Sequence, residues 1–209
     1  MNIKVCGVTT MKQLQQLDGL DVDFAGLIFY KRSPRYAGDK ISKEELQDAD
    51  LDIKKVGVFV NEEFDEVMET VEKYSLDVVQ LHGDESPHLC EQISNEIETI
   101  KAFRVDDHSD KSIDYMLKDY DDVCDYYLFG TNDSLGSAGE KFNWNILSKL
   151  KIEKPFFLSG GISVDDAEKI KAFKHLDFYG ININSRFEKE PGIKDMSLIL
   201  QLKQGFKSK

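Results

Sequence analysis

The segment KKVGVFVNEEFDEVMETVEKYSLDVVQLH, residues 54–82, contains two short apolar runs separated by an amphipathic stretch. The runs KKVGVFV (54–60) and LDVVQLH (76–82) are mostly continuous in apolar residues, which is typical of strands that a parallel sheet buries on both faces. Residues 61–74 open with asparagine and acidic side chains and then place apolar residues at three- and four-residue spacing. This pattern predicts an amphipathic helix, so the segment predicts a strand–helix–strand unit.

The same alternation runs along the whole chain. Six further apolar runs predict strands: IKVCG (3–7), DFAGLIFY (23–30), IKAFRV (100–105), CDYYLFG (124–130), KPFFLSG (154–160) and LDFYGININ (176–184). Helices are predicted over 10–18, 61–74, 86–93, 163–173 and 193–206. Eight strands alternating with helices predict a single (β/α)8 TIM barrel over residues 1–209, with no domain boundary. The alternative is an open doubly wound sheet, but no G-x-G-x-x-G follows the first strand.

Composition narrows the range of partners. The chain of 209 residues has a formal net charge of -12, with 41% hydrophobic and 32% charged residues. This charge argues against a nucleic acid or an anionic membrane as the main partner, but not against a small anionic ligand in a locally positive pocket. No apolar run approaches the roughly 20 residues that span a bilayer, and none has signal-peptide character. The three cysteines lack metal-ligand spacing, so we expect no metal site and a reduced, cytoplasmic location.

In a barrel the chemistry lies at the carboxyl ends of the strands and in the loops that follow them. The candidate side chains are therefore Cys6, the loop 31–36, Asn61, residues 82–84, Arg104, the loop 130–139, residues 159–161 and residues 182–187.

Cys6 has two interpretations from its spacing alone. A cysteine inside a strand often acts as a small buried hydrophobic residue. A thiol at a barrel mouth can instead serve as a proton-abstracting thiolate if a positive neighbour or a helix N-terminus stabilises it.

The loop YKRSPRY, residues 30–36, carries three cations within five residues. It can be a solvated basic loop. Alternatively Arg35, which follows a proline turn, can hold a carboxylate or phosphate through its planar guanidinium.

Two glycine-bearing loops predict an anion site. LSGGIS (158–163) places Gly160 and Gly161 before a helix, where backbone N–H groups can approach an anion, or where they simply form a tight turn. GSAGEKFNW (136–144) is a second such loop, with Gly136 and Gly139. By contrast, we expect His82 to make a structural hydrogen bond and Trp144 to pack at a helix start.

The motifs KVCG, SPR, VGVFVN, QLHGDESP, IKAFRV, FLSGGI and EPGIKD, in this order, resemble the phosphoribosylanthranilate isomerase family of tryptophan biosynthesis. The resemblance covers essentially the whole chain. It implies a cofactor-free (β/α)8 barrel, a monomer or homodimer, that takes a small phosphorylated substrate. The implied reaction converts N-(5-phosphoribosyl)anthranilate into 1-(2-carboxyphenylamino)-1-deoxyribulose 5-phosphate by an Amadori rearrangement.

The resemblance also implies roles for individual residues. Cys6 is the general base, and Arg35 engages the anthranilate carboxylate. The phosphate is expected on Gly136, Gly139, Gly160, Gly161, Asn184 and Ser185. The other expected barrel-mouth residues are His82, Arg104 and Asn182.

The chain departs from the family at the general acid. The family has aspartate after strand 6 in an L-F-D-T context, whereas residue 130 here is glycine, and a strand 8 aspartate is replaced by Asn182. One account is that Asp133, three residues on, replaces the acid. Another is a weakened paralogue that binds a sugar phosphate without efficient turnover, since losing a general acid typically costs about 10²–10⁴-fold in rate. A third is a changed ligand.

Overall fold

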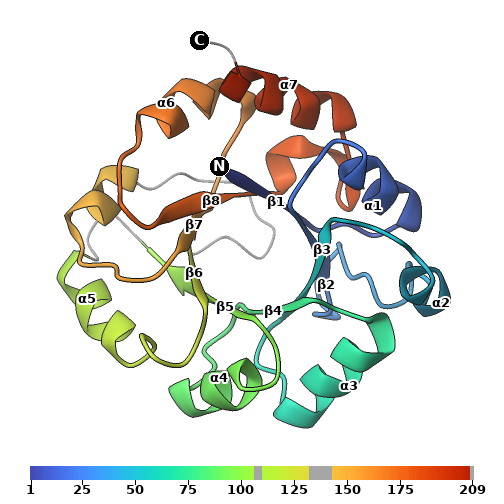
Figure 1. The fold of residues 1–209 in the computed structure, drawn as a ribbon, viewed down its shortest axis with the longest axis horizontal. Coiled ribbons are helices and arrows are strands. Elements are labelled where there is room, and N and C mark those ends of the chain that lie inside the picture. The colour runs from blue at the N-terminus through green and yellow to red at the C-terminus, as the bar shows by residue number, and fades with distance from the viewer. Residues whose placement is uncertain (106–109, 132–142, 208–209) are drawn as a thin grey trace.

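The computed structural model describes residues 1–105, 110–131 and 143–207. Its centre is a closed barrel in which each strand pairs in parallel with the next and the eighth pairs with the first. The strands are β1 (Asn2–Cys6), β2 (Phe24–Ile28), β3 (Lys54–Phe59), β4 (Val78–Leu81), β5 (Thr99–Arg104), β6 (Tyr126–Gly130), β7 (Phe156–Leu158) and β8 (Phe178–Ile183). Figure 1 shows these strands as a central ring with the helices outside it. The predicted (β/α)8 barrel is confirmed.

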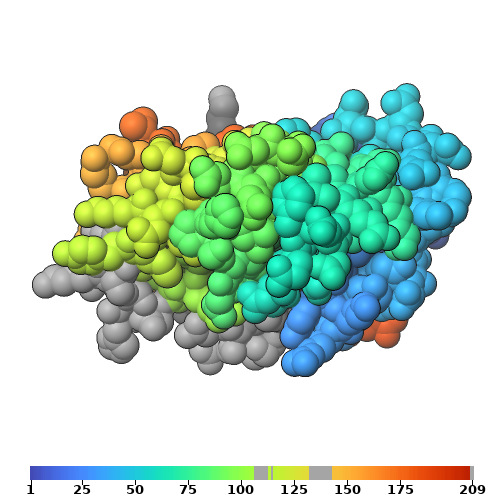
Figure 2. Space-filling view, turned by 90° about the horizontal axis from the view of Figure 1, so that it is seen from below, coloured from blue at the N-terminus to red at the C-terminus, as the bar shows by residue number. Residues whose placement is uncertain are grey.

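Helices cover the outside of the barrel between the strands. They are α1 (Met11–Asp18), α2 (Lys43–Gln47), α3 (Phe64–Tyr74), α4 (Pro87–Ser94), α5 (Asp110–Lys118), α6 (Ala167–Ala172) and α7 (Met196–Lys207), with the 3-10 helices η1 (Trp144–Lys149), η2 (Val164–Asp166) and η3 (Ser185–Phe187). Their starts follow from local chemistry: the side chains of Thr10, Ser42 and Ser86 each accept a hydrogen bond from a first-turn N–H group. Figure 2 shows from the side how the segments around α3 and α4, coloured green, cover the strands.

Two predicted helices begin later than the sequence pattern indicates. The helix predicted from residue 61 begins at Phe64, because Asn61 is held in a left-handed conformation with φ 54°. The backbone N–H of Asn61 donates to Glu85, and its side-chain oxygen accepts from the N–H of Asp84, which ties it to the loop after β4.

The last helix begins at Met196 rather than at residue 193. Residues Ile193–Lys194 form β10, which pairs with β9 (Glu188–Glu190) in a small antiparallel ribbon after β8. The predicted helix 163–173 is also divided, since its first turn is the 3-10 helix η2. The short helix α2 and the helix α5 lie outside the predicted set.

The barrel interior has an apolar floor and a polar layer above it. The floor is a cluster of buried inward-facing side chains: Phe24, Val56, Val78, Ile100, Ala102, Leu128 and Phe157. Above it lie buried polar residues, among them Lys4, Gln80, Ser159 and Asn182. A second, larger apolar cluster packs the strands against the surrounding helices. Within the described ranges, no helix combines the length and apolar character needed to cross a membrane.

Candidate active site

The carboxyl ends of the strands bring several of the predicted residues to one end of the barrel. Cys6 ends β1, His82 follows β4, and Arg104 and Gly130 end β5 and β6, where they pair in register. Asn182 lies near the end of β8, opposite Lys4 of β1. The predicted mouth therefore forms from segments that are far apart in the sequence.

Cys6 is buried at the end of β1, where it packs against Ile28, Val58 and Tyr30 inside the barrel. The next residue, Gly7, has φ 79°, a conformation that favours glycine, and its N–H donates to the carbonyl of Gly26. The thiol is free, and it has Lys4 and Lys194 as interacting cations. These are the neighbours that a thiolate needs.

The other two cysteines lie in apolar surroundings. Cys90 and Cys124 belong to the cluster between barrel and helices, and burial raises their pKa to about 11 and about 12 respectively. Both thiols therefore stay protonated near neutral pH, which leaves Cys6 as the thiol at the mouth.

A buried hydrogen-bonded chain lies directly below Cys6. The Lys4 ammonium donates to Asn182 Oδ1 at 2.9 Å, and Asn182 Nδ2 donates to Ser159 Oγ at 2.9 Å. All three side chains belong to buried residues, so this chain fixes the orientation of the Asn182 amide.

His82 makes the structural hydrogen bond that the sequence analysis predicts. The amide nitrogen Nε2 of Gln80 lies 2.6 Å from His82 Nδ1, and this pairing places the ring proton of a neutral imidazole on Nε2. Burial, with added repulsion from Lys4, Lys101 and Arg104, lowers the pKa of His82 to about 3. His82 is therefore neutral at pH 7 and can donate a hydrogen bond from Nε2 without carrying charge.

Arg35 is held in a buried cluster with Glu188 and Lys194. Arg35 Nε donates to both Glu188 carboxylate oxygens at 2.9 and 3.0 Å, and Nη2 donates to Oε2 at 2.7 Å. Lys194 Nζ donates to Glu188 Oε1 and to Asn184 Oδ1, both at 2.7 Å. Arg35 Nη1 is buried and, among the described residues, lacks a hydrogen-bond partner.

Burial and charge shift the protonation of this cluster in opposite directions. Burial lowers the pKa of Lys194 to about 8 although Glu188 and Cys6 favour its charged form. Burial alone would raise the pKa of Glu188, but hydrogen bonds from Arg35 and Lys194 outweigh it and the pKa lies below its ordinary value. The cluster carries two positive charges and one negative charge when all three groups are ionised, so it favours an anion.

A second buried ion pair shapes the loop after β4. Lys101 Nζ lies 2.8 Å from Glu85 Oε2 and also donates to the carbonyl of Gly83. The Glu85 carboxylate accepts from the N–H groups of Gly83 and Asn61. Arg104 lies 3.6 Å from Asp84, in a more exposed pair. The buried pair therefore fixes the loop that carries His82.

The predicted phosphate loops are described in part. Gly160 and Gly161 have φ 91° and 60°, so this turn requires glycine and exposes its backbone N–H groups before η2. Ser185 begins η3, while Asn184 accepts from Lys194. Gly136, Gly139 and Asp133 lie outside the described residues.

The other two cations of the SPR loop lie elsewhere. Lys31 and Arg32 line a cavity of about 550 Å³ that α3 borders with Glu66 and Glu69. Their positive charge therefore faces an acidic helix, whereas Arg35 points to the ribbon after β8.

The comparisons with known proteins agree with this geometry. A model of the N-(5'phosphoribosyl)anthranilate (PRA) isomerase family matches residues 3–205. The chain belongs to this family. The N-(5'-phosphoribosyl)anthranilate isomerase of Parabacteroides distasonis is 40% identical over 199 residues, which cover 94% of this chain and 89% of the relative. That of Phocaeicola vulgatus is 35% identical and covers 98% of each. The crystal structure of the Thermotoga maritima isomerase has a TM-score of 0.85 at 26% identity and covers 99% of this chain and 98% of its own.

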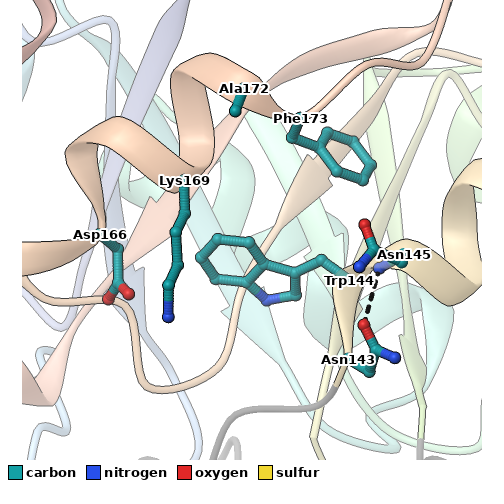
Figure 3. Close-up of a pocket in the computed structure, with 7 residues that line it drawn as sticks. All are labelled: Asn143, Trp144, Asn145, Asp166, Lys169, Ala172 and Phe173. Atoms are coloured by element: carbon teal, nitrogen blue, oxygen red, sulfur yellow. Dashed lines mark hydrogen bonds between the residues drawn. The ribbon is translucent and has the colours of Figure 1, made fainter.

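This member of the PRA isomerase family also has a cavity outside the mouth. It measures about 450 Å³ and lies between η1 and α6 (Figure 3). Trp144 begins η1 and packs against the main apolar cluster, as predicted for a residue at a helix start. In Figure 3 its ring lies between Lys169 and Phe173, away from the strands' carboxyl ends.

Sequence reasoning missed three buried charged residues of this PRA isomerase site. Lys4 stands two residues before Cys6 in an otherwise apolar run, so strand alternation alone indicates that both share one face. Lys194 lies within the EPGIKD motif, but its partner Glu188 precedes that motif without a local signal. The pairing of Arg35 with Glu188 joins residues 153 positions apart, and single-sequence patterns do not encode it.

Proposed function

We propose that the chain catalyses the isomerisation of N-(5'-phosphoribosyl)anthranilate to 1-(2-carboxyphenylamino)-1-deoxyribulose 5-phosphate. The family match over residues 3–205 carries this proposal, and the position of the Cys6 thiol at the barrel mouth supports it. A related isomerase, 25% identical, was solved in complex with reduced 1-(o-carboxyphenylamino)-1-deoxyribulose 5-phosphate. We therefore propose a phosphorylated small molecule of this kind as the substrate.

The reaction needs an acid and a base on a small substrate. The acid protonates the ribose ring oxygen, the bond from that oxygen to C1 breaks, and an iminium forms. The base then removes the proton at C2 to give the enolamine, which tautomerises to the ketone product. Cys6 is the proposed base because it is a free thiol at the mouth with two cations in interaction with it.

Arg35 and the strand-end loops are the proposed anchors of the substrate's two anionic ends. Arg35 supports the carboxylate role because its Nη1 is the guanidinium nitrogen without a partner among the described residues. Gly160 and Gly161 are proposed for the phosphate, together with Gly136, Gly139, Asn184 and Ser185, because positive-φ glycines before a helical turn present N–H donors to an anion.

The general acid is the open part of the proposal. Gly130 ends β6 in register with Arg104, at the place where the family carries aspartate. Asp133 is the proposed substitute because it follows the same strand end three residues later. His82, Arg104 and Asn182 complete the proposed mouth.

We propose a cytoplasmic location, supported by membership of a biosynthetic enzyme family and by three free cysteines. The proposed assembly is a monomer or a homodimer.

The test is the consumption of phosphoribosylanthranilate that is generated in situ and followed by its fluorescence. We expect the wild-type protein to consume it faster than the protein-free blank and to form the ketone product. A wild-type rate equal to the blank, with tight binding of the reduced product analogue, would replace this proposal by ligand binding without turnover.

A further inference from the structure

Lys4 and Cys6 approach each other on the inner face of the barrel. They are two residues apart on β1, so strand alternation places them on the same face. A side-chain carbon built on Gly26 of the neighbouring β2 would lie 2.8 Å from Cys6 Sγ and 3.0 Å from Lys4 Nζ. The sulfur and the amine therefore border the same small space, which exists because residue 26 is glycine.

Lys4 is a fully buried amine without a carboxylate partner among residues 1–105, 110–131 and 143–207. It is 0% exposed, and its described hydrogen-bond acceptor is the neutral amide of Asn182. Burial lowers the pKa of Lys4, and its interaction with the Cys6 thiol opposes that shift. A buried ammonium requires a nearby negative charge, and the acidic group at hand is this thiol.

We propose that Lys4 and Cys6 share one proton, and that Lys4 is the positioning residue that keeps Cys6 in its ionised form. The proton leaves Sγ and binds the Nζ lone pair, which gives an ammonium beside a thiolate inside the barrel. The inference rests on the proposed function of Cys6 as base and adds the group that activates it. Adjacent bases activate nucleophilic side chains in the same way elsewhere.

Asn182 is what leaves Lys4 available for Cys6. Its Nδ2 donates to Ser159 Oγ, which turns Oδ1 toward the Lys4 amine. The neutral amide oxygen orients the amine without cancelling its charge. An aspartate at this position would supply a full negative charge 2.9 Å from Nζ and would compete with the thiolate for it.

The other charged groups that face Cys6 are already balanced or neutral. Lys194 of β10 interacts with Cys6, but Glu188 lies 2.7 Å from it and also pairs with Arg35. His82, after β4, is uncharged at neutral pH because its pKa is about 3. Lys4 is thus the cation near Cys6 whose charge no described carboxylate offsets.

The experiment measures alkylation of Cys6 by iodoacetamide in the native protein from pH 5 to 9.5, with the Cys6 peptide followed by mass spectrometry. Following this peptide alone removes any contribution from Cys90 and Cys124. The variants are Lys4→Met and Asn182→Asp, and the matched control is Lys54→Met, which removes an exposed lysine at the opposite end of the barrel.

We expect the alkylation midpoint to rise by about one to three pH units in Lys4→Met. It should also rise in Asn182→Asp, which keeps the lysine and the side-chain size. At pH 7 each unit corresponds to about tenfold slower alkylation. The control should match the wild type.

Unchanged midpoints in folded Lys4→Met and in Asn182→Asp would overturn the inference. If Lys4→Met does not fold, Asn182→Asp decides alone. Because alkylation does not depend on turnover, a protein without isomerase activity that still shows these shifts would refute the proposed function and leave the shared proton in place.

Discussion

Glu188 holds the negative charge between two buried cations, and replacing it by glutamine tests whether that cluster fixes the mouth. The Glu188 carboxylate lies 2.7 Å from Arg35 Nη2 and 2.7 Å from Lys194 Nζ. The side chains of Arg35 and Glu188 are 4% exposed and that of Lys194 is 0% exposed. Removing one partner of a buried ion pair typically costs about 3–5 kcal/mol, because it leaves the other charge buried without compensation.

The expected cost lies toward the lower end of that range. Without Glu188, Lys194 loses the group that favours its charged form, so its pKa falls further below about 8 and it becomes neutral at pH 7. Arg35 alone then remains as an uncompensated buried charge. We therefore expect Glu188→Gln to lower the free energy of unfolding by about 3 kcal/mol at pH 7. This is a large part of the roughly 5–15 kcal/mol that stabilises a typical domain.

Urea unfolding followed by circular dichroism measures this loss as a lower midpoint at an unchanged slope. The matched control is Glu168→Gln, which breaks an exposed ion pair with Lys171 and should cost at most about 1 kcal/mol. A Glu188→Gln protein as stable as the control would refute the claim that the buried cluster ties the loop after β2 to the ribbon after β8.

Three further outcomes follow from the site. Gly130→Asp should raise the isomerase rate by about 10²–10⁴-fold, since it restores an acid at the end of β6, and steady-state rates without any gain would count against an otherwise intact site. Folding lowers the pKa of Lys194 from 10.5 to about 8, so the unfolded chain binds more protons between these values and stability should rise by about 3 kcal/mol from pH 8 to 10.5. Urea midpoints across this range should rise less in Lys194→Met, and equal slopes would contradict the assignment. Glu85→Ala should cost about 3–5 kcal/mol in the same assay because it leaves Lys101 buried and unpaired, whereas Asp84→Ala should be nearly neutral; equal effects would disprove the role of the buried pair.

Regular elements could be predicted where local pattern and tertiary structure agree. The eight strands follow from continuous apolar runs, since a parallel sheet buries both faces of each strand. Thr10 and Ser86 mark helix starts because their caps are local. The start of α3 was misplaced because Asn61 is held by residues of another loop. The helix α2 has only five residues, too few for a periodic signal.

The candidate site divides along the same line. Cys6, Arg35 and the Gly160–Gly161 turn follow from short motifs at strand ends. The groups that set their charge come from distant parts of the chain: Lys4 is oriented from β8, and Arg35 from β9. Such pairings are fixed by closure of the barrel and by burial, and no local pattern determines them.

The rate of phosphoribosylanthranilate consumption by Cys6→Ala, beside the wild type, tests the central claim most directly. Alanine removes the thiol from a small pocket formed with Ile28 and Val58, so the fold and the binding of the reduced product analogue should persist. The account predicts a wild-type rate above the blank and a Cys6→Ala rate equal to the blank. A Cys6→Ala protein that turns over substrate at the wild-type rate would contradict it.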